Sequence, residues 1–106
     1  MNLNLNYEGF EKFLLKRISR DTESIGYLGI QEGVQYIFKF DNGFGASVIK
    51  RWSSYGHEDD LWELGVITFD RYDEWELTYD TPITNDVLGY RTDEEIRDLL
   101  KEIKEL

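Results

Sequence analysis

The fold is decided by the stretch "VQYIFKFDNGFGASVIKRW", residues 34–52, in which two β-rich runs flank Asn42-Gly43. An Asn-Gly pair between such runs predicts a β-hairpin with a two-residue type I′ turn, because both central residues of that turn need a positive φ. The cross-strand pairs that follow are Asp41 with Phe44, Phe40 with Gly45, Phe38 with Ser47 and Tyr36 with Ile49.

Side-chain alternation along these two runs places apolar residues on both faces of the hairpin. The first face holds Val34, Tyr36, Phe38 and Phe40, and the second holds Ile37, Ala46, Val48 and Trp52. Either the hairpin is central in a sheet and covered on both sides, or one face is an exposed patch that binds a partner. The exposed-patch interpretation includes a homodimer formed through residues 34–52.

A second hairpin follows, formed by "LWELGVITF" (61–69) and "WELTYD" (75–80). A four-residue loop at residues 70–73 pairs Trp75 with Thr68 and Leu77 with Val66, which brings the apolar residues of both strands to one face. A slip of one residue would destroy that match, so we expect this register. Extending it places Glu63 opposite Asp80.

Two helices are expected, one at each end of the chain. The segment 6–21 repeats apolar residues at helical spacing, with Asn6 as N-cap and a basic stripe of Lys12, Lys16 and Arg20. The segment 91–106 has a capping box of Thr92 and Glu95. Its apolar stripe consists of Ile96, Leu99, Leu100, Ile103 and Leu106.

The remaining segments read as a strand and a connector. "IGYLGI" (25–30) predicts a further strand, and "DTPITNDVLGY" (80–90) predicts a packed loop that begins where Pro82 ends the preceding strand. Tyr90 is expected to belong to a hydrophobic staple. The sequence therefore predicts one α+β domain spanning residues 1–106. It has an N-terminal helix, a mainly antiparallel sheet of four or five strands, and a C-terminal helix, with both helices packed on sheet faces.

Composition limits the functional classes. The chain of 106 residues has no Cys, and no apolar run approaches the ~20 residues that span a membrane. "MNLNLN" lacks the basic and apolar parts of a signal peptide, so we expect a cytoplasmic protein with no membrane contact.

Charge is divided unevenly along the chain. Residues 1–57 hold 6 acidic and 7 basic side chains, whereas residues 58–106 hold 16 acidic and 5 basic ones. An acidic half argues against direct binding of nucleic acid, because each phosphate contact needs a cation. It favours either a solubilising surface or a surface that pairs with the cations of another protein.

Catalytic signals are weak. The chain's one histidine, His57, lies in a polar loop beside acidic residues that favour its charged form, which is a poor metal ligand. The G-x-G of "DNGFG" precedes a strand rather than a helix, so it does not form a phosphate site. Like charges at Glu63 and Asp80 would need a nearby cation, either Arg91, a divalent ion or a partner's side chain. We expect no enzyme, no cofactor and no resident metal.

The phrases "FKFDNGFGASVIKRW", "LWELGVITFD" and "WELTYDTPITNDVLGY", together with the capped C-terminal helix, resemble a family of small acidic proteins from phages and prophages of Gram-positive bacteria. The resemblance covers residues 34–106. It implies an accessory protein, a class that often inhibits host machinery and includes anti-CRISPR and anti-restriction proteins.

We therefore expect a non-enzymatic inhibitor that binds a host nucleic-acid-binding defence protein or nuclease by acidic mimicry of nucleic acid. The carboxylates expected to contact the partner's basic groove are those of Glu58, Asp59, Asp60, Glu63, Asp73, Glu74, Glu76 and Asp80. An immunity protein against a nuclease toxin would bind through the same pairing of carboxylates with a basic groove. Two further alternatives are a component of the virion or its assembly, and a binder of nucleotide signals with phosphate contacts from Lys39, Lys50 and Arg51.

Overall fold

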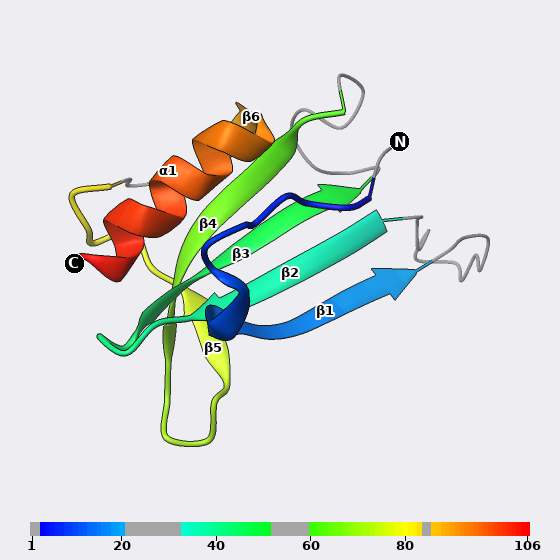
Figure 1. Cartoon of the computed structure of the whole chain (residues 1–106). Coiled ribbons are helices and arrows are strands. Elements are labelled where there is room, and N and C mark those ends of the chain that lie inside the picture. Colours follow the sequence, from blue (N-terminus) through cyan, green and yellow to red (C-terminus); the bar gives the residue numbers. More distant parts are fainter. Residues whose placement is uncertain (1–2, 21–32, 52–59, 84–85) are drawn as a thin grey trace.

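The computed structural model describes residues 3–20, 33–51, 60–83 and 86–106, and it is an α+β fold built on one antiparallel sheet (Figure 1). The strands are β1 (Leu14–Arg20), β2 (Gly33–Lys39), β3 (Phe44–Arg51), β4 (Trp62–Phe69), β5 (Trp75–Leu77) and β6 (Leu88–Arg91). They follow the order β1-β2-β3-β4-β5, and β6 also pairs with β4. A 3-10 turn, Glu11–Phe13, precedes β1, and the helix α1 (Asp93–Lys104) follows β6.

The N-terminal helix predicted over residues 6–21 is wrong in its described part, residues 6–20. Only the 3-10 turn is helical, and residues 14–20 form β1, which pairs with β2 and places Arg17 beside Tyr36. Gly9 has a φ of 95°, which interrupts any helix in its first turn. Backbone pairing with β2 then outweighs the helical spacing of the side chains. The expected basic stripe is lost with the helix. The strand predicted at 25–30 lies outside the described residues.

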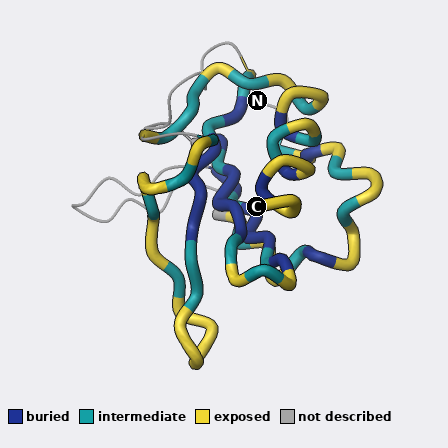
Figure 2. Tube along the Cα trace, turned by 90° about the vertical axis from the view of Figure 1, so that its left-hand side faces the viewer, coloured by how far each residue is buried: buried dark blue, intermediate teal, exposed yellow. Residues whose placement is uncertain are grey.

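Helix α1 and the N-terminal segment lie on the same face of the sheet and form the second layer of the fold (Figures 1 and 2). The buried side chains between the layers are Leu5, Phe13, Val34, Tyr36, Phe38, Phe40, Ala46, Val48, Trp62, Leu64, Val66, Ile96, Leu100 and Ile103. The N-terminal segment is held in place by Tyr36, whose hydroxyl donates to the carbonyl of Leu3 at 3.0 Å and accepts from the amide of Leu5 at 3.2 Å. We call the opposite side of the sheet the rear face.

The first hairpin forms where predicted, but its register differs by one residue. Lys39 pairs with Gly45 and Phe38 pairs with Ala46, which leaves a three-residue loop at 41–43. Within that loop only Gly43 has a positive φ, 87°, so the two-residue type I′ turn does not form. Ala46 and Val48 therefore join Phe38 on the helix face, and Ser47 turns to the rear face. The predicted position of Trp52 lies outside the described residues.

The register of the second hairpin also differs from the prediction by one residue. Ile67 pairs with Leu77, and Asp73, with a φ of 61°, completes a three-residue loop at 71–73. The predicted pairing of Leu77 with Val66 is therefore wrong, and Leu77 lies on the rear face. Hydrophobicity did not fix this register because Val66 and Ile67, which point to opposite faces of β4, are both buried.

The segment after β5 contributes a strand that the sequence did not predict. Strand β5 ends at Leu77, before the expected stop at Pro82, and β6 pairs with the same edge of β4 through Trp62 with Arg91 and Leu64 with Leu88. Among the described residues of the predicted connector, Ile83 packs on the core. Tyr90 is 53% exposed, which does not fit the predicted staple.

Helix α1 is confirmed with its capping box. The Thr92 hydroxyl accepts from the Glu95 amide at 3.2 Å, and the Glu95 carboxylate accepts from the Thr92 amide at 2.9 Å. The Thr92 amide holds the pKa of Glu95 below its ordinary value. The stabilisation from this carboxylate is therefore present above its ordinary pKa and is lost as the pH falls through the lowered one.

The C-terminal end of α1 is bound by the turn of the first hairpin. The side-chain amide of Asn42 lies 2.8 Å from the carbonyl oxygen of Ile103 and 3.2 Å from those of Lys104 and Leu106. The same side chain accepts from the Phe44 amide at 3.0 Å. Asn42 therefore adds a side-chain donor to the last carbonyls of the helix, of which Ile103 also accepts from the Leu106 amide at 3.2 Å.

We predict that Asn42→Ala lowers the free energy of unfolding by about 1–2 kcal/mol, since it removes the hydrogen bonds of Asn42 to the Ile103 carbonyl and the Phe44 amide. Urea unfolding followed by circular dichroism measures the change. Asp41→Ala, in the same turn and exposed, is the control and should change stability by less than about 0.5 kcal/mol. Equal effects of the two substitutions would contradict this role of Asn42.

Two glycines in the sheet, Gly45 and Gly65, leave room for neighbouring groups that a Cβ would displace. A Cβ at Gly45 would overlap the carbonyl oxygen of Phe38 and lie 2.7 Å from the Phe69 ring. A Cβ at Gly65 would lie 2.5 Å from Cδ2 of Leu77, which is the end of a half-exposed side chain. The first obstacle is backbone and cannot move away, whereas the second can rotate.

We therefore predict that Gly45→Ala lowers the free energy of unfolding by about 3 kcal/mol and Gly65→Ala by about 1 kcal/mol. Thermal and urea unfolding of the two variants measure both changes. Comparable losses in the two variants would show that the close approach at Gly45 is not the tighter constraint.

Candidate protein-binding site

Residues 69–80, here called the arm, hold half of the acidic residues predicted to contact a partner. Asp73, Glu74, Glu76 and Asp80 lie on it, and its turn projects beyond the rest of the sheet (Figures 1 and 2). Glu58 and Asp59 lie outside the described residues, as does His57. The structure thus brings four of the eight predicted carboxylates onto one segment.

Asp60 has a structural role instead. Its carboxylate forms an ion pair with the ammonium of Lys50 at 3.1 Å. The Lys50 side chain is only 2% exposed, and its ammonium lies 4.1 Å from the centroid of the Trp62 ring. A basic partner would therefore compete with a buried cation for Asp60.

The cations proposed for a nucleotide signal are not arranged for that role. Lys50 is buried and cannot contact a phosphate, while Lys39 forms an ion pair with Asp73 and lies 5.4 Å from the centroid of the Phe69 ring. The side chain of Arg51 lies outside the described residues. Of the three expected phosphate contacts, Lys50 is therefore excluded by its burial.

Glu63 and Asp80 do not face each other. Glu63 pairs with Ile49 of β3, and Asp80 follows the end of β5, so the one-residue change of register removes the expected pair of like charges. In the described ranges, no group of three or more His, Cys, Asp or Glu side chains is arranged to hold a metal ion. Likewise, no helix among them is long and apolar enough to cross a membrane.

The arm uses two of its carboxylates to hold its own turn. Oδ1 of Asp70 accepts from the amides of Tyr72 at 2.7 Å and Glu74 at 3.1 Å, and Asp73 is paired with Lys39. Glu74, Glu76 and Asp80 are exposed, and the ion pairs of the described residues do not include them. These three carboxylates are the ones that can face a partner.

A small acidic hollow lies on the arm. Its volume is about 230 Å³, and its lining residues are Thr68, Phe69, Asp70, Glu74, Trp75 and Glu76. Three of these six side chains carry a carboxylate. The hollow therefore presents negative charge on a concave surface of the size of one basic side chain.

Exposed apolar side chains lie along the same segment. Tyr72 at the turn is 70% exposed, and Leu77 and Tyr79 are 46% and 45% exposed. Tyr72 could have been found, because it lies at the centre of a turn between acidic residues, where burial is least expected.

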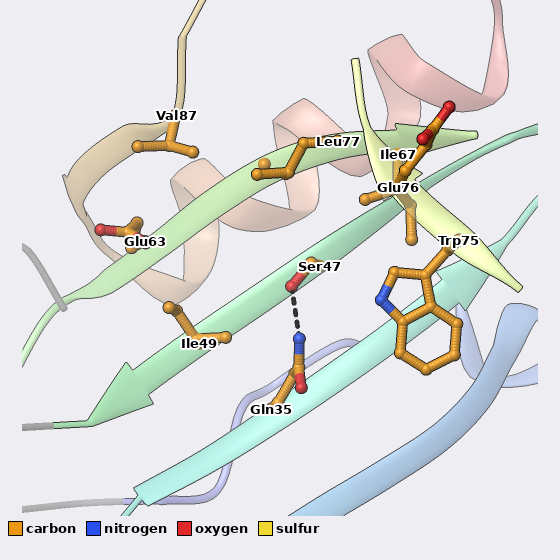
Figure 3. A pocket seen from close by; sticks show the side chains of 10 residues that line it. Gln35, Ser47, Ile49, Glu63, Ile67, Trp75, Glu76, Leu77 and Val87 are labelled. Atoms are coloured by element: carbon orange, nitrogen blue, oxygen red, sulfur yellow. Dashed lines mark hydrogen bonds between the residues drawn. The ribbon is translucent and has the colours of Figure 1, made fainter. Parts of the chain in front are cut away.

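A second hollow lies on the rear face, between the arm and the sheet (Figure 3). Its volume is about 320 Å³, and its lining residues are Gln35, Ser47, Ile49, Glu63, Gly65, Ile67, Trp75, Glu76, Leu77 and Val87. Trp75 forms one end of it and also reaches β1, where the ammonium of Lys16 lies 5.1 Å from the ring centroid. The arm thus folds across the rear face.

The β2–β3 hairpin proposed as a dimer interface is central in the sheet, between β1 and β4, and α1 packs on one of its faces. Self-association through residues 34–52 would therefore have to use the rear face. Ile37 is fully buried there already.

Comparisons with known proteins found no matching family model, no matching curated protein and no matching solved structure. The resemblance to phage and prophage proteins therefore stays a prediction.

The pairing of Lys50 with Asp60 leads to a stability prediction. We expect Asp60→Asn to lower the free energy of unfolding by about 2 kcal/mol, because it removes a negative charge that lies 3.1 Å from the buried ammonium. Lys50→Met should cost less, since it removes that charge and keeps an unbranched side chain against Trp62. Urea unfolding at pH 7 measures both. A larger loss in Lys50→Met than in Asp60→Asn would contradict this account.

Proposed function

We propose that this protein is a non-enzymatic inhibitor that binds the basic, nucleic-acid-binding groove of a host protein through its arm. The observation that carries the proposal is the combination on one projecting segment of exposed carboxylates and exposed apolar side chains. The arm has five acidic residues and one basic residue.

Electrostatics supports a basic partner. Glu74 and Glu76 line the acidic hollow, so a lysine or arginine from the partner would meet two carboxylates there beside Asp70. Charge of this kind mainly accelerates encounter and selects the partner. A groove that normally holds a nucleic-acid backbone supplies a matching row of cations. Occupying it would exclude the nucleic acid.

The apolar residues of the arm supply binding energy that its charges alone do not. Exposed ion pairs contribute little affinity, whereas a few aromatic anchors carry most of the binding energy of an interface. Tyr72 and Tyr79 are suited to that role, because a tyrosine buries an apolar ring and keeps a hydroxyl for hydrogen bonding.

The resemblance implies that such an inhibitor acts in the cytoplasm of a bacterial host. Its target there would be a defence protein or nuclease, as for anti-CRISPR and anti-restriction proteins. An immunity protein would use the same arm against a toxin nuclease. The identity of a captured target separates the two.

We predict that the double reversal Glu74→Lys/Glu76→Lys abolishes capture of a basic protein from a Gram-positive host lysate. The matched control is Asp98→Lys/Glu102→Lys, which changes net charge equally on the exposed face of α1. Pull-downs at 0.1 M and 1 M salt measure capture, because the Debye length falls from ~10 Å to ~3 Å between them. The expected partner is retained by wild type and control at low salt, and added duplex DNA displaces it.

Loss of capture in both double variants would show that capture depends on the net charge of the protein and not on the carboxylates of the arm. Capture that survives the arm reversal would remove the arm from the interface. A captured protein that DNA does not displace would leave binding in place and contradict the occupation of a nucleic-acid groove.

A further inference from the structure

Strand β1 is an open edge of the sheet. It pairs with β2 on one side, and among the described residues no strand pairs with its other side (Figure 1). At seven residues it is longer than β5 and β6, which have three and four and lie along the opposite edge. The unpaired N–H and C=O groups of an edge strand can bind another chain. Of the two edges, β1 is therefore the one better able to bind an added strand.

The hydrogen-bonding pattern of the first hairpin shows which backbone groups of β2 face β1. At the hairpin turn, the Phe40 amide donates to the Phe44 carbonyl at 2.9 Å, so these two residues form a hydrogen-bonded pair. Hydrogen-bonded and non-hydrogen-bonded pairs alternate along antiparallel strands, and the register of β2 with β3 is continuous from this turn. The backbone groups of Gln35 and Ile37 therefore point away from β3 and toward β1.

The same alternation identifies the outward groups of β1. Ile18 and Lys16 pair with the two β2 residues that face β1, so their N–H and C=O groups belong to the ladder between the strands. The backbone groups of Arg17 and Ser19 then point away from the sheet. Each of these two residues offers one donor and one acceptor to a neighbouring strand.

The charged side chains along this edge are cations without a carboxylate partner. Lys16 and Arg17 are exposed, and the ion pairs of the described residues do not include them. The Lys16 ammonium lies 5.1 Å from the centroid of the Trp75 ring. The Arg17 guanidinium donates to the Tyr36 hydroxyl at 2.9 Å and to the Leu3 carbonyl at 3.3 Å. These contacts position both cations and leave their charge uncompensated. A second copy of β1 would bring like charges together, which is unfavourable, whereas an acidic strand would be attracted.

We propose that the outer edge of β1 binds an extended acidic segment of another protein, which adds a strand to the six-stranded sheet. The backbone of this segment bonds to Arg17 and Ser19. Its Asp or Glu side chains, at every second position, lie on the rear face beside Lys16. Leu15, which lies at the break in register before Lys16 and is 38% exposed, adds an apolar contact. This interface is separate from the arm and does not rest on the proposed function.

The test uses a capped heptapeptide in which glutamate alternates with valine, titrated into the full-length protein and followed by nitrogen-15 NMR. We expect saturable shifts along β1 and slower solvent exchange of the Arg17 and Ser19 amides, because these gain hydrogen-bond acceptors. The amides of Lys16 and Ile18 already belong to the ladder with β2, so their exchange should change less. The same peptide with glutamine in place of glutamate should bind about threefold more weakly, and the peptide with lysine should not bind.

Two substitutions at one position separate the backbone from the side chain. Ser19→Pro removes an outward N–H and keeps the ladder with β2, since proline is tolerated on the open side of an edge strand. It should weaken the glutamate peptide about tenfold. Ser19→Ala keeps the N–H and is the matched control, which should bind like the wild type. Lys16→Gln should weaken the peptide about threefold, and Lys101→Gln, exposed on α1, is the control for net charge.

Unchanged exchange of the Arg17 and Ser19 amides at saturating peptide would overturn the proposal, and this measurement on the wild type decides even where Ser19→Pro does not fold. Equal binding of the glutamate and lysine peptides would overturn it too, as would wild-type affinity in folded Ser19→Pro. A single-stranded oligothymidylate that binds β1 more tightly than the glutamate peptide would assign its cations to nucleic acid and also overturn the proposal.

Discussion

The burial of Trp62 is the constraint on which the rest of the structure depends. Its indole N–H donates to Asp93 at 2.6 Å, and the other carboxylate oxygen of Asp93 accepts from the amide of Asn6 at 3.2 Å. Its ring lies against Tyr36 and beneath the ammonium of Lys50. One side chain thus connects β2, β3, β4, the start of α1 and the N-terminal segment. A buried indole needs a hydrogen-bond partner, and here that requirement positions the helix.

The basic first half of the chain holds the acidic second half in place. Lys16 reaches the Trp75 ring, and Lys39 reaches both Asp73 and Phe69. These lysines stand on β1 and β2, so the arm is tied to strands distant from β5 in the sheet order. The uneven charge along the sequence therefore has an internal use besides the proposed external one, and the carboxylates of Glu74, Glu76 and Asp80 are what remains for a partner.

Features governed by neighbouring residues could be predicted from the sequence. The capping box of α1, its apolar stripe at Ile96, Leu100 and Ile103, and the positions of both turns are of this kind. The registers were not predictable from hydrophobicity, because both faces of β4 are apolar and either register buries one of them. The deciding residues are Gly43 and Asp73, whose positive φ completes a three-residue loop in each hairpin.

In the N-terminal segment, a local pattern predicted the wrong secondary structure. Its side chains recur at helical spacing, and Phe10 and Phe13 do contact Phe40, yet pairing with β2 selects a strand. At the candidate site, the acidity of the arm could be predicted from composition. The burial of Lys50 could not, because nothing local distinguishes it from Lys39. Only the fold places Trp62 and Asp60 beside it.

Asn42 joins a turn at residue 42 to a helix end 61 to 64 residues later in the chain. Opening the first hairpin therefore withdraws the donor from the last turn of α1, and fraying of that turn releases the hairpin loop. Because hairpin loops and helix ends are usually the first parts of a domain to open, joining them makes two weak regions into one cooperative unit. Their amides should exchange with solvent at a common rate, while those of the arm exchange at a rate of their own.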